Sequence, residues 1–106
     1  MTLDEKYQQI IDDQRVNLLK LQEGFNKKCD EIKESAITKL KDIPEGNKEA
    51  RENVLKEQKE ELNKSLSELK QNVDQSTRET MKKLEGIVHE KELKVLEDLE
   101  NQMQSL

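Results

Sequence analysis

The chain has almost no aromatic residues: one tyrosine, one phenylalanine and no tryptophan among 106 residues. Only 31% of its residues are hydrophobic, whereas 41% are charged. A compact globule of this length has to bury more apolar volume, because burial must offset the conformational entropy that folding removes. Two classes remain. The chain is either disordered or built from long helices whose narrow apolar stripes meet along a seam.

Glycine and proline are scarce as well, with three glycines and one proline. The abundance of Glu, Lys, Leu and Gln favours helix. The single proline lies in the segment Ile43-Pro44-Glu45-Gly46-Asn47. Pro44 disfavours helical geometry at Ile43, Gly46 has the backbone freedom that a tight turn needs, and Asn47 is a good N-cap. We predict that residues 43–47 form a turn that reverses the chain between two helices.

Cysteine and long apolar runs are also missing. The single cysteine, Cys29, cannot form an internal disulfide, and no apolar run approaches the ~20 residues of a membrane span. The N-terminal residues lack the basic start and apolar core of a signal peptide. These features predict a cytoplasmic protein, although an effector exported by a non-classical route would share them.

The charge pattern makes two classes of partner improbable. Net charge is −5, and acidic and basic residues alternate without a basic block, so with so few aromatics we expect no nucleic-acid binding. Residues 89–106 contain five acidic and two basic side chains, which argues against docking on anionic lipid. We therefore do not expect a membrane partner.

Residues suited to catalysis are few and isolated. His89 is followed by Glu90, but Leu93 stands where the zinc motif H-E-x-x-H needs its second histidine. Cys29 falls on an apolar stripe and fits a small core residue, with redox-sensitive cross-linking across a dimer axis as the alternative. No glycine-rich phosphate loop or carboxylate pair in an apolar pocket is evident. We expect neither an enzyme nor a bound cofactor or metal.

The first helix is predicted over residues 3–42. Thr2 and Glu5 have the spacing of a capping box just ahead of a periodic run. From Leu18 onward the steps between apolar residues are 3, 4, 4, 3, 4, 4 and 3, which is an 11-residue repeat. The residues that follow this spacing are Leu18, Leu21, Phe25, Cys29, Ile32, Ala36, Leu40 and Ile43.

The second helix is predicted over residues 48–104, because the 11-residue repeat returns and counts against both strands and disorder. One phase holds Leu62, Val73, Leu84, Val95 and Leu106, and another holds Leu55, Leu66, Thr77, Val88 and Leu99. A second capping box is available at Ser76 and Glu79. It would break the helix near Asp74–Thr77 and give a three-helix bundle, the alternative fold. The unbroken phase favours one continuous helix.

Folding the chain at the turn predicts a single all-α domain over residues 1–106, a long antiparallel coiled-coil hairpin. The apolar stripes then meet along a seam, and Gln14 falls opposite Ser76 and Thr77. Polar residues that meet within a seam fix its register. The predicted seam residues are Leu18, Leu21, Phe25 and Ile32 on the first helix and Leu62, Leu66, Leu69, Val73 and Leu84 on the second.

In this register the first helix ends opposite residue 88, so residues 89–106 form a helical extension without a partner in the hairpin. Exposed apolar seams mark association sites, and we expect self-association to a homodimer or a higher helical bundle. The candidate interaction residues are Leu93, Leu96, Leu99, Met103 and Leu106. The function that fits best is a non-catalytic interaction protein acting as adaptor, scaffold or small helical chaperone.

Two other functions use the same features differently. Lipid-surface and hydrophobic-carrier helices also use 11-residue repeats, but this chain has narrow stripes and a polar face that is not rich in lysine. A regulatory module could instead use residues 89–106 to sequester the helix of a heterologous partner.

Overall fold

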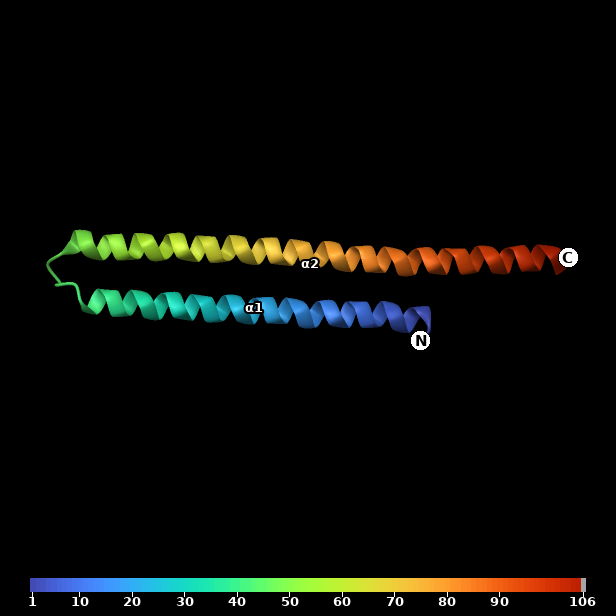
Figure 1. Cartoon of the computed structure of the whole chain (residues 1–106), viewed down its shortest axis with the longest axis horizontal. Helices are drawn as coiled ribbons and strands as arrows, with labels where there is room; N and C mark the ends of the chain where they lie inside the picture. The colour runs from blue at the N-terminus through green and yellow to red at the C-terminus, as the bar shows by residue number, and fades with distance from the viewer. Residues whose placement is uncertain (106) are drawn as a thin grey trace. The chain divides into compact units, whose positions relative to one another are not determined.

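The computed structural model describes residues 1–105, and its regular structure consists of two α-helices. Helix α1 spans Leu3–Lys41 and α2 spans Lys48–Ser105, which together make 92% of the chain helical (Figure 1). No strand occurs within the described residues. The sequence placed the two C-terminal ends at residues 42 and 104, so each differs by one residue, which is the usual uncertainty of a helix end.

Helix α1 begins at a side-chain cap. The backbone N–H of Glu5 donates to Thr2 Oγ1 at 3.1 Å, and the N–H of Lys6 donates to the Thr2 carbonyl at 3.1 Å. This is the Thr2 half of the predicted capping box. Acidic residues in the first turn and lysines in the last turn complement the helix dipole.

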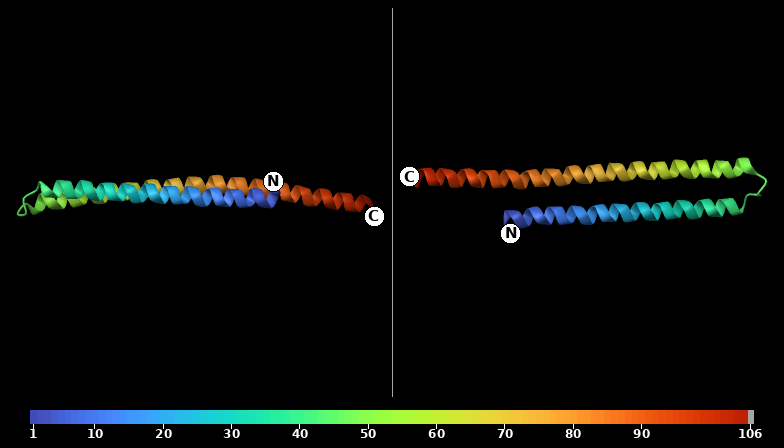
Figure 2. Two further views of the ribbon diagram at one scale, coloured as in Figure 1. Left: turned by 90° about the horizontal axis from the view of Figure 1, so that it is seen from below. Right: turned by 180° about the vertical axis from the view of Figure 1, so that it is seen from behind.

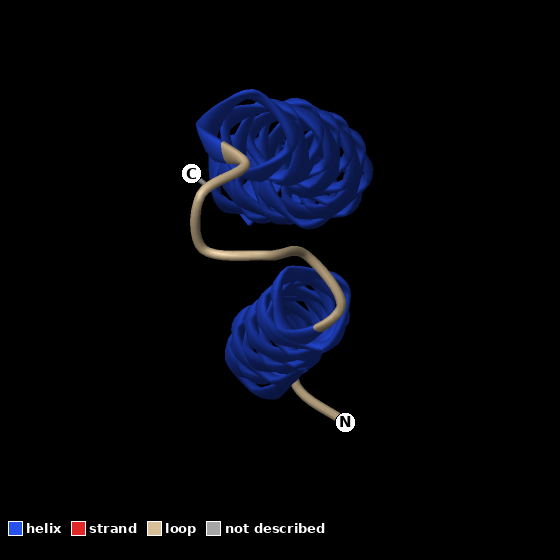
Figure 3. Ribbon diagram, turned by 90° about the vertical axis from the view of Figure 1, so that its left-hand side faces the viewer, coloured by secondary structure: helices blue, strands red, loops and turns tan. Residues whose placement is uncertain are grey.

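The turn between the helices is built by Pro44 and Asn47. The N–H of Asn47 donates to the Pro44 carbonyl at 3.0 Å, and Asn47 Oδ1 then accepts from the N–H of Ala50 at 3.2 Å and caps α2. The guanidinium of Arg51 donates to the Ile43 carbonyl at 3.3 Å, joining the start of α2 to the chain just after α1. Figure 3 shows this loop crossing from one helix to the other.

Contacts divide the chain into two units. The turn unit comprises Leu18–Asp74, and the terminal unit comprises Met1–Asn17 with α2 from Gln75 onward. In each unit a piece of α1 runs antiparallel to a piece of α2 (Figures 1 and 2). Ion pairs link the helices in both: Lys39 Nζ lies 3.8 Å from Glu57 in the turn unit, and Lys6 Nζ lies 3.9 Å from Glu90 in the terminal unit.

Helix α2 is continuous through Asp74–Thr77, so the three-helix alternative is not adopted. Ser76 does not cap a new helix. Its hydroxyl instead donates to the side chain of Gln14 at 2.7 Å. A hydrogen-bond partner on α1 therefore satisfies the serine without breaking the helix.

The covered face of each helix is narrow. The only apolar side chains that are buried within the described residues are Leu3, Ile32 and Val54, at 7%, 4% and 8% exposed. On α2, three polar side chains are buried equally well: Gln58, Ser65 and Ser76. Val54, Ser65 and Ser76 are separated by 11 residues each.

The covered face of α2 differs from the predicted seam. Leu62 and Leu66 are 39% and 40% exposed and lie at its edge, while Ser65 is 7% exposed. Leu18 on α1 is similarly placed, at 36% exposed. The covered positions of α2 are held by Val54, Gln58, Ser65 and Ser76, and the leucines lie beside them. An 11-residue spacing alone does not determine whether the leucines or the serines of α2 are turned toward α1.

Candidate interaction surface

A cluster of polar side chains joins the helices of the terminal unit. Gln14 Oε1 accepts hydrogen bonds from the hydroxyls of Ser76 at 2.7 Å and Thr80 at 2.8 Å. Asn17 Nδ2 in turn donates to Ser76 Oγ at 2.6 Å. A partly buried polar cluster of this kind is favourable only when its members are paired, and it fixes which residues of the two helices face each other.

The sequence correctly predicted that Gln14 meets Ser76, because each residue interrupts an apolar stripe. The second predicted partner, Thr77, is wrong: it is exposed, and Thr80 takes its place. Thr80 lies one helical turn beyond Ser76 and therefore on the same face. Asn17 was missed because it lies beside the stripe rather than in it.

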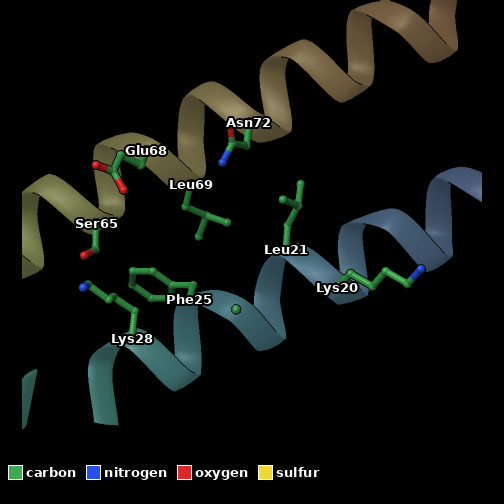
Figure 4. A pocket seen from close by; sticks show the side chains of 9 residues that line it. Lys20, Leu21, Phe25, Lys28, Ser65, Glu68, Leu69 and Asn72 are labelled. Carbon is green, nitrogen blue, oxygen red and sulfur yellow. The ribbon is translucent and has the colours of Figure 1, made fainter. Parts of the chain in front are cut away.

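In the turn unit three of the predicted seam residues line a groove of about 290 Å³ (Figure 4). Leu21 and Phe25 project from α1 toward Leu69 on α2, and all three are half-buried. Gly24 lies in the same wall of α1, so the groove has no side chain there. Lys20, Lys28, Glu68 and Asn72 complete the lining with Ser65.

The remaining predicted seam residues divide into two groups. Ile32 is buried, and Val73 and Leu84 are half-buried. Leu18, Leu62 and Leu66 lie at the exposed edge described above. The turn residues Pro44, Gly46 and Asn47 form the loop between the helices as expected.

One buried polar side chain on α2 has no hydrogen-bond partner. Gln58 is 5% exposed, and neither its Oε1 nor its Nε2 is hydrogen-bonded. A buried amide that gains no partner loses its interactions with water without replacement. Gln58 therefore weakens the turn unit locally, and no sequence signal marked it out.

The predicted interaction residues lie on an uncovered part of α2 in the terminal unit. Every described residue from Val88 onward is exposed. We call residues 89–105 the overhang: its first residues lie beside the start of α1, where Glu90 pairs with Lys6, and α2 then continues beyond the first residue of α1 (Figures 1 and 2). Leu93, Leu96, Leu99 and Met103 are 52%, 50%, 55% and 74% exposed, as is Val95 at 48%. Leu106, the fifth predicted residue, lies outside the described residues.

The charges of the overhang change along its length. Its two lysines, Lys91 and Lys94, alternate with Glu90 and Glu92, whereas residues 97–100 contain three acidic residues and no base, and residues 101–105 carry no charge. Leu96, Leu99 and Met103 are spaced by three and four residues and therefore share one face of the helix. The overhang thus presents an apolar row that follows a segment of mixed charge and is flanked by acidic residues at 97–100.

An open groove of about 420 Å³ adjoins this row in the terminal unit. Its apolar lining combines Tyr7 of α1, 43% exposed, with Met81, Leu84 and Val88 of α2, of which Met81 and Val88 are 50% and 60% exposed. Glu85, His89 and Glu92 form the rest of the lining. The sequence did not reveal this groove, because it needs Tyr7 and Met81 to be brought together from distant parts of the chain.

The residues with catalytic potential are not gathered into a site. His89 is exposed and lies 3.8 Å from Glu92 one turn along the helix, and Cys29 is half-buried on α1. Within residues 1–105, no group of three or more His, Cys, Asp or Glu side chains is arranged to hold a metal ion. Neither helix, over its described length, contains an apolar stretch long enough for a bilayer crossing.

No protein-family model matches the chain, and no curated protein or solved structure is significantly similar to it. The candidate surface is therefore defined by its own residues: the apolar row of the overhang and the adjoining groove.

Proposed function

We propose that this protein is a non-catalytic helical interaction protein that forms a homodimer through its overhang and acts as an adaptor, scaffold or small helical chaperone in the cytoplasm. The observation that carries the proposal is the uncovered row of Leu93, Leu96, Leu99 and Met103, each at least half exposed. Exposed apolar rows of this kind mark association sites.

The large exposed area of the chain favours association with a partner. The chain exposes 8871 Å², whereas a compact monomer of 12.4 kDa exposes roughly 6,100 Å² by the usual scaling with mass. The excess area includes the apolar row of the overhang, so association would remove apolar surface from water.

The charge pattern favours a second copy as the partner and an antiparallel arrangement. When two overhangs run antiparallel, the acidic residues 97–100 of each lie against residues 92–95 of the other, which carry one charge of each sign, and Lys94 lies opposite Asp98 of the second copy. Leu96 then faces Leu96 of the second copy, and Leu93 faces its Leu99. A parallel arrangement would instead set the acidic segments side by side, which repels.

The test is to replace Leu96 with glutamate and measure oligomeric state by sedimentation across concentration, with circular dichroism as a check on folding. Leu96→Glu should weaken the dimer at least about 100-fold, since each dimer loses two leucine contacts at 1.4 kcal/mol per tenfold change in affinity. Asn101→Glu is the matched control, because it adds the same charge on the opposite face of the overhang.

Three outcomes are informative. A wild-type protein that stays monomeric at all concentrations and remains helical contradicts self-association. Loss of the dimer in both variants contradicts the assigned face. Binding of the wild-type monomer to neutral vesicles, or to an amphipathic helical peptide, would support the lipid-carrier or the helix-sequestering function instead.

A further inference from the structure

The groove of Tyr7, Met81, Leu84 and Val88 is open on the surface of the terminal unit. It opens beside the first residues of the overhang, since Val88, His89 and Glu92 line it. Tyr7, Met81 and Val88 are each at least two-fifths exposed, so much of its wall is accessible to a side chain from outside the unit.

We propose that this groove receives the Met103 side chain of a second copy, so that each dimer contains two identical sites completed by the partner. This inference rests on the antiparallel pairing proposed above. It adds a specific occupant to the groove and extends the dimer contact from the overhang to α1.

The position of Met103 follows from the pairing. If Leu96 faces Leu96 of the second copy, then Met103, seven residues later, faces the residue seven before, which is His89. Val88 is its neighbour, and both line the groove. Seven residues of helix span about 10 Å, so the two sites lie on either side of the central leucine pair.

The chemistry of the two surfaces agrees with this occupant. The rim of the groove carries Glu85 and Glu92, which would repel an acidic segment. Residues 101–105, around Met103, have no charge, and in this register Asp98 lies opposite Lys94, Glu97 opposite Val95 and Glu100 opposite Glu92. A methionine side chain is flexible and packs well against an aromatic ring such as that of Tyr7.

With the groove included, the dimer interface is larger than the contact between the two overhangs alone. Leu93, Leu96 and Leu99 of two copies form a short antiparallel helix pair, and short isolated helix pairs are marginal in water. Seating Met103 at each end adds apolar burial against residues that α1 and α2 already hold in place. The Met103 side chain is 74% exposed in the monomer, so it breaks few contacts within its own chain when it enters the groove.

The test uses two variants in a Cys29→Ser background, one carrying Val88→Cys and the other Met103→Cys. Each alone should give no cross-linked dimer on mild oxidation, because equivalent positions lie about 20 Å or more apart along the antiparallel pair. The equimolar mixture should give a disulfide-linked dimer. Glu90→Cys mixed with Met103→Cys is the matched control and should not cross-link, since residue 90 faces away from the overhang's apolar row.

A second measurement uses the wild-type protein. Tyr7 is the only tyrosine and there is no tryptophan, so tyrosine fluorescence reports on the groove alone. Its quenching by acrylamide should fall as the protein dimerises. A dimer by sedimentation with no mixed cross-link and unchanged quenching overturns the groove assignment and leaves the overhang dimer standing. A monomer at every concentration overturns both.

Discussion

Polar side chains, more than leucines, occupy the most covered positions of α2. Ser76 is paired with Gln14 and Asn17, whereas Gln58 is buried with both amide atoms unpaired. The two residues therefore have opposite effects on stability. A paired polar group in a seam contributes modestly and sets the register, and an unpaired one costs its lost hydration.

Replacing Gln58 with leucine should stabilise the protein by about 1–2 kcal/mol, because it removes the unpaired amide and adds apolar burial. The measurement is urea unfolding followed by circular dichroism. Gln71→Leu, at an exposed position of the same helix, is the control and should change stability little. A destabilised Gln58→Leu variant would show that the amide has a partner after all.

Replacing Ser76 with alanine should destabilise the protein by about 0.5–1.5 kcal/mol, because Asn17 and Gln14 each lose a hydrogen-bond partner. Ser67→Ala is the matched control, since Ser67 is exposed on α2 and its substitution changes only helix propensity. Equal stability of the two variants, measured by the same unfolding experiment, would remove the polar cluster as a stabilising feature.

Contacts between the two helices could be predicted only at polar residues that interrupt an apolar stripe. Gln14 and Ser76 each interrupt an apolar stripe, and the structure confirms that they meet. Leu62 and Leu66 were placed in the seam because they are apolar, yet Ser65 is the covered residue. Periodicity gives the repeat but not the rotation of the helix about its axis, and that rotation depends on how closely the two backbones approach.

At the scale of the elements, local signals determine where the helices begin and end. Thr2 caps α1, and Pro44 and Asn47 stop one helix and start the next through hydrogen bonds that involve neighbouring residues. These interactions are short-range, which is why the sequence was sufficient to predict them. The continuity of α2 through Ser76 was also predictable, because the apolar phase is unbroken there.

Glycine in the middle of α1 is a weakness that can be removed. A Cβ added at Gly24 would meet nothing within 4 Å, and its φ is not positive. Gly24→Ala should therefore raise the free energy of unfolding by about 0.5–1 kcal/mol through helix propensity. Gly86→Ala, which also meets nothing within 4 Å, should give a similar gain on α2. A loss of stability in Gly24→Ala alone would show that the gap in the groove wall is required for packing.

At the scale of the whole molecule, the two helices leave the overhang and one groove uncovered. The overhang was predictable from the length of α2 beyond the turn and from its apolar spacing. The groove of Tyr7 and Met81 was not, because it depends on side chains from both helices and on the rotation of α2. In the proposed dimer, Lys94 would lie opposite Asp98 of a second copy, and this pairing would favour one direction for the partner.

In the proposed dimer, two overhangs pair antiparallel. The most direct test attaches spin labels through Gln104→Cys in a Cys29→Ser background and measures the distance between the labels of the dimer by pulsed electron paramagnetic resonance. Antiparallel pairing centred on Leu96 separates the two labelled positions by about 24 Å along the helices, from 1.5 Å per residue. A distance near 24 Å or longer is the predicted result. A distance near the ~10 Å spacing of adjacent parallel helices, or no dipolar signal at any protein concentration, would contradict antiparallel pairing.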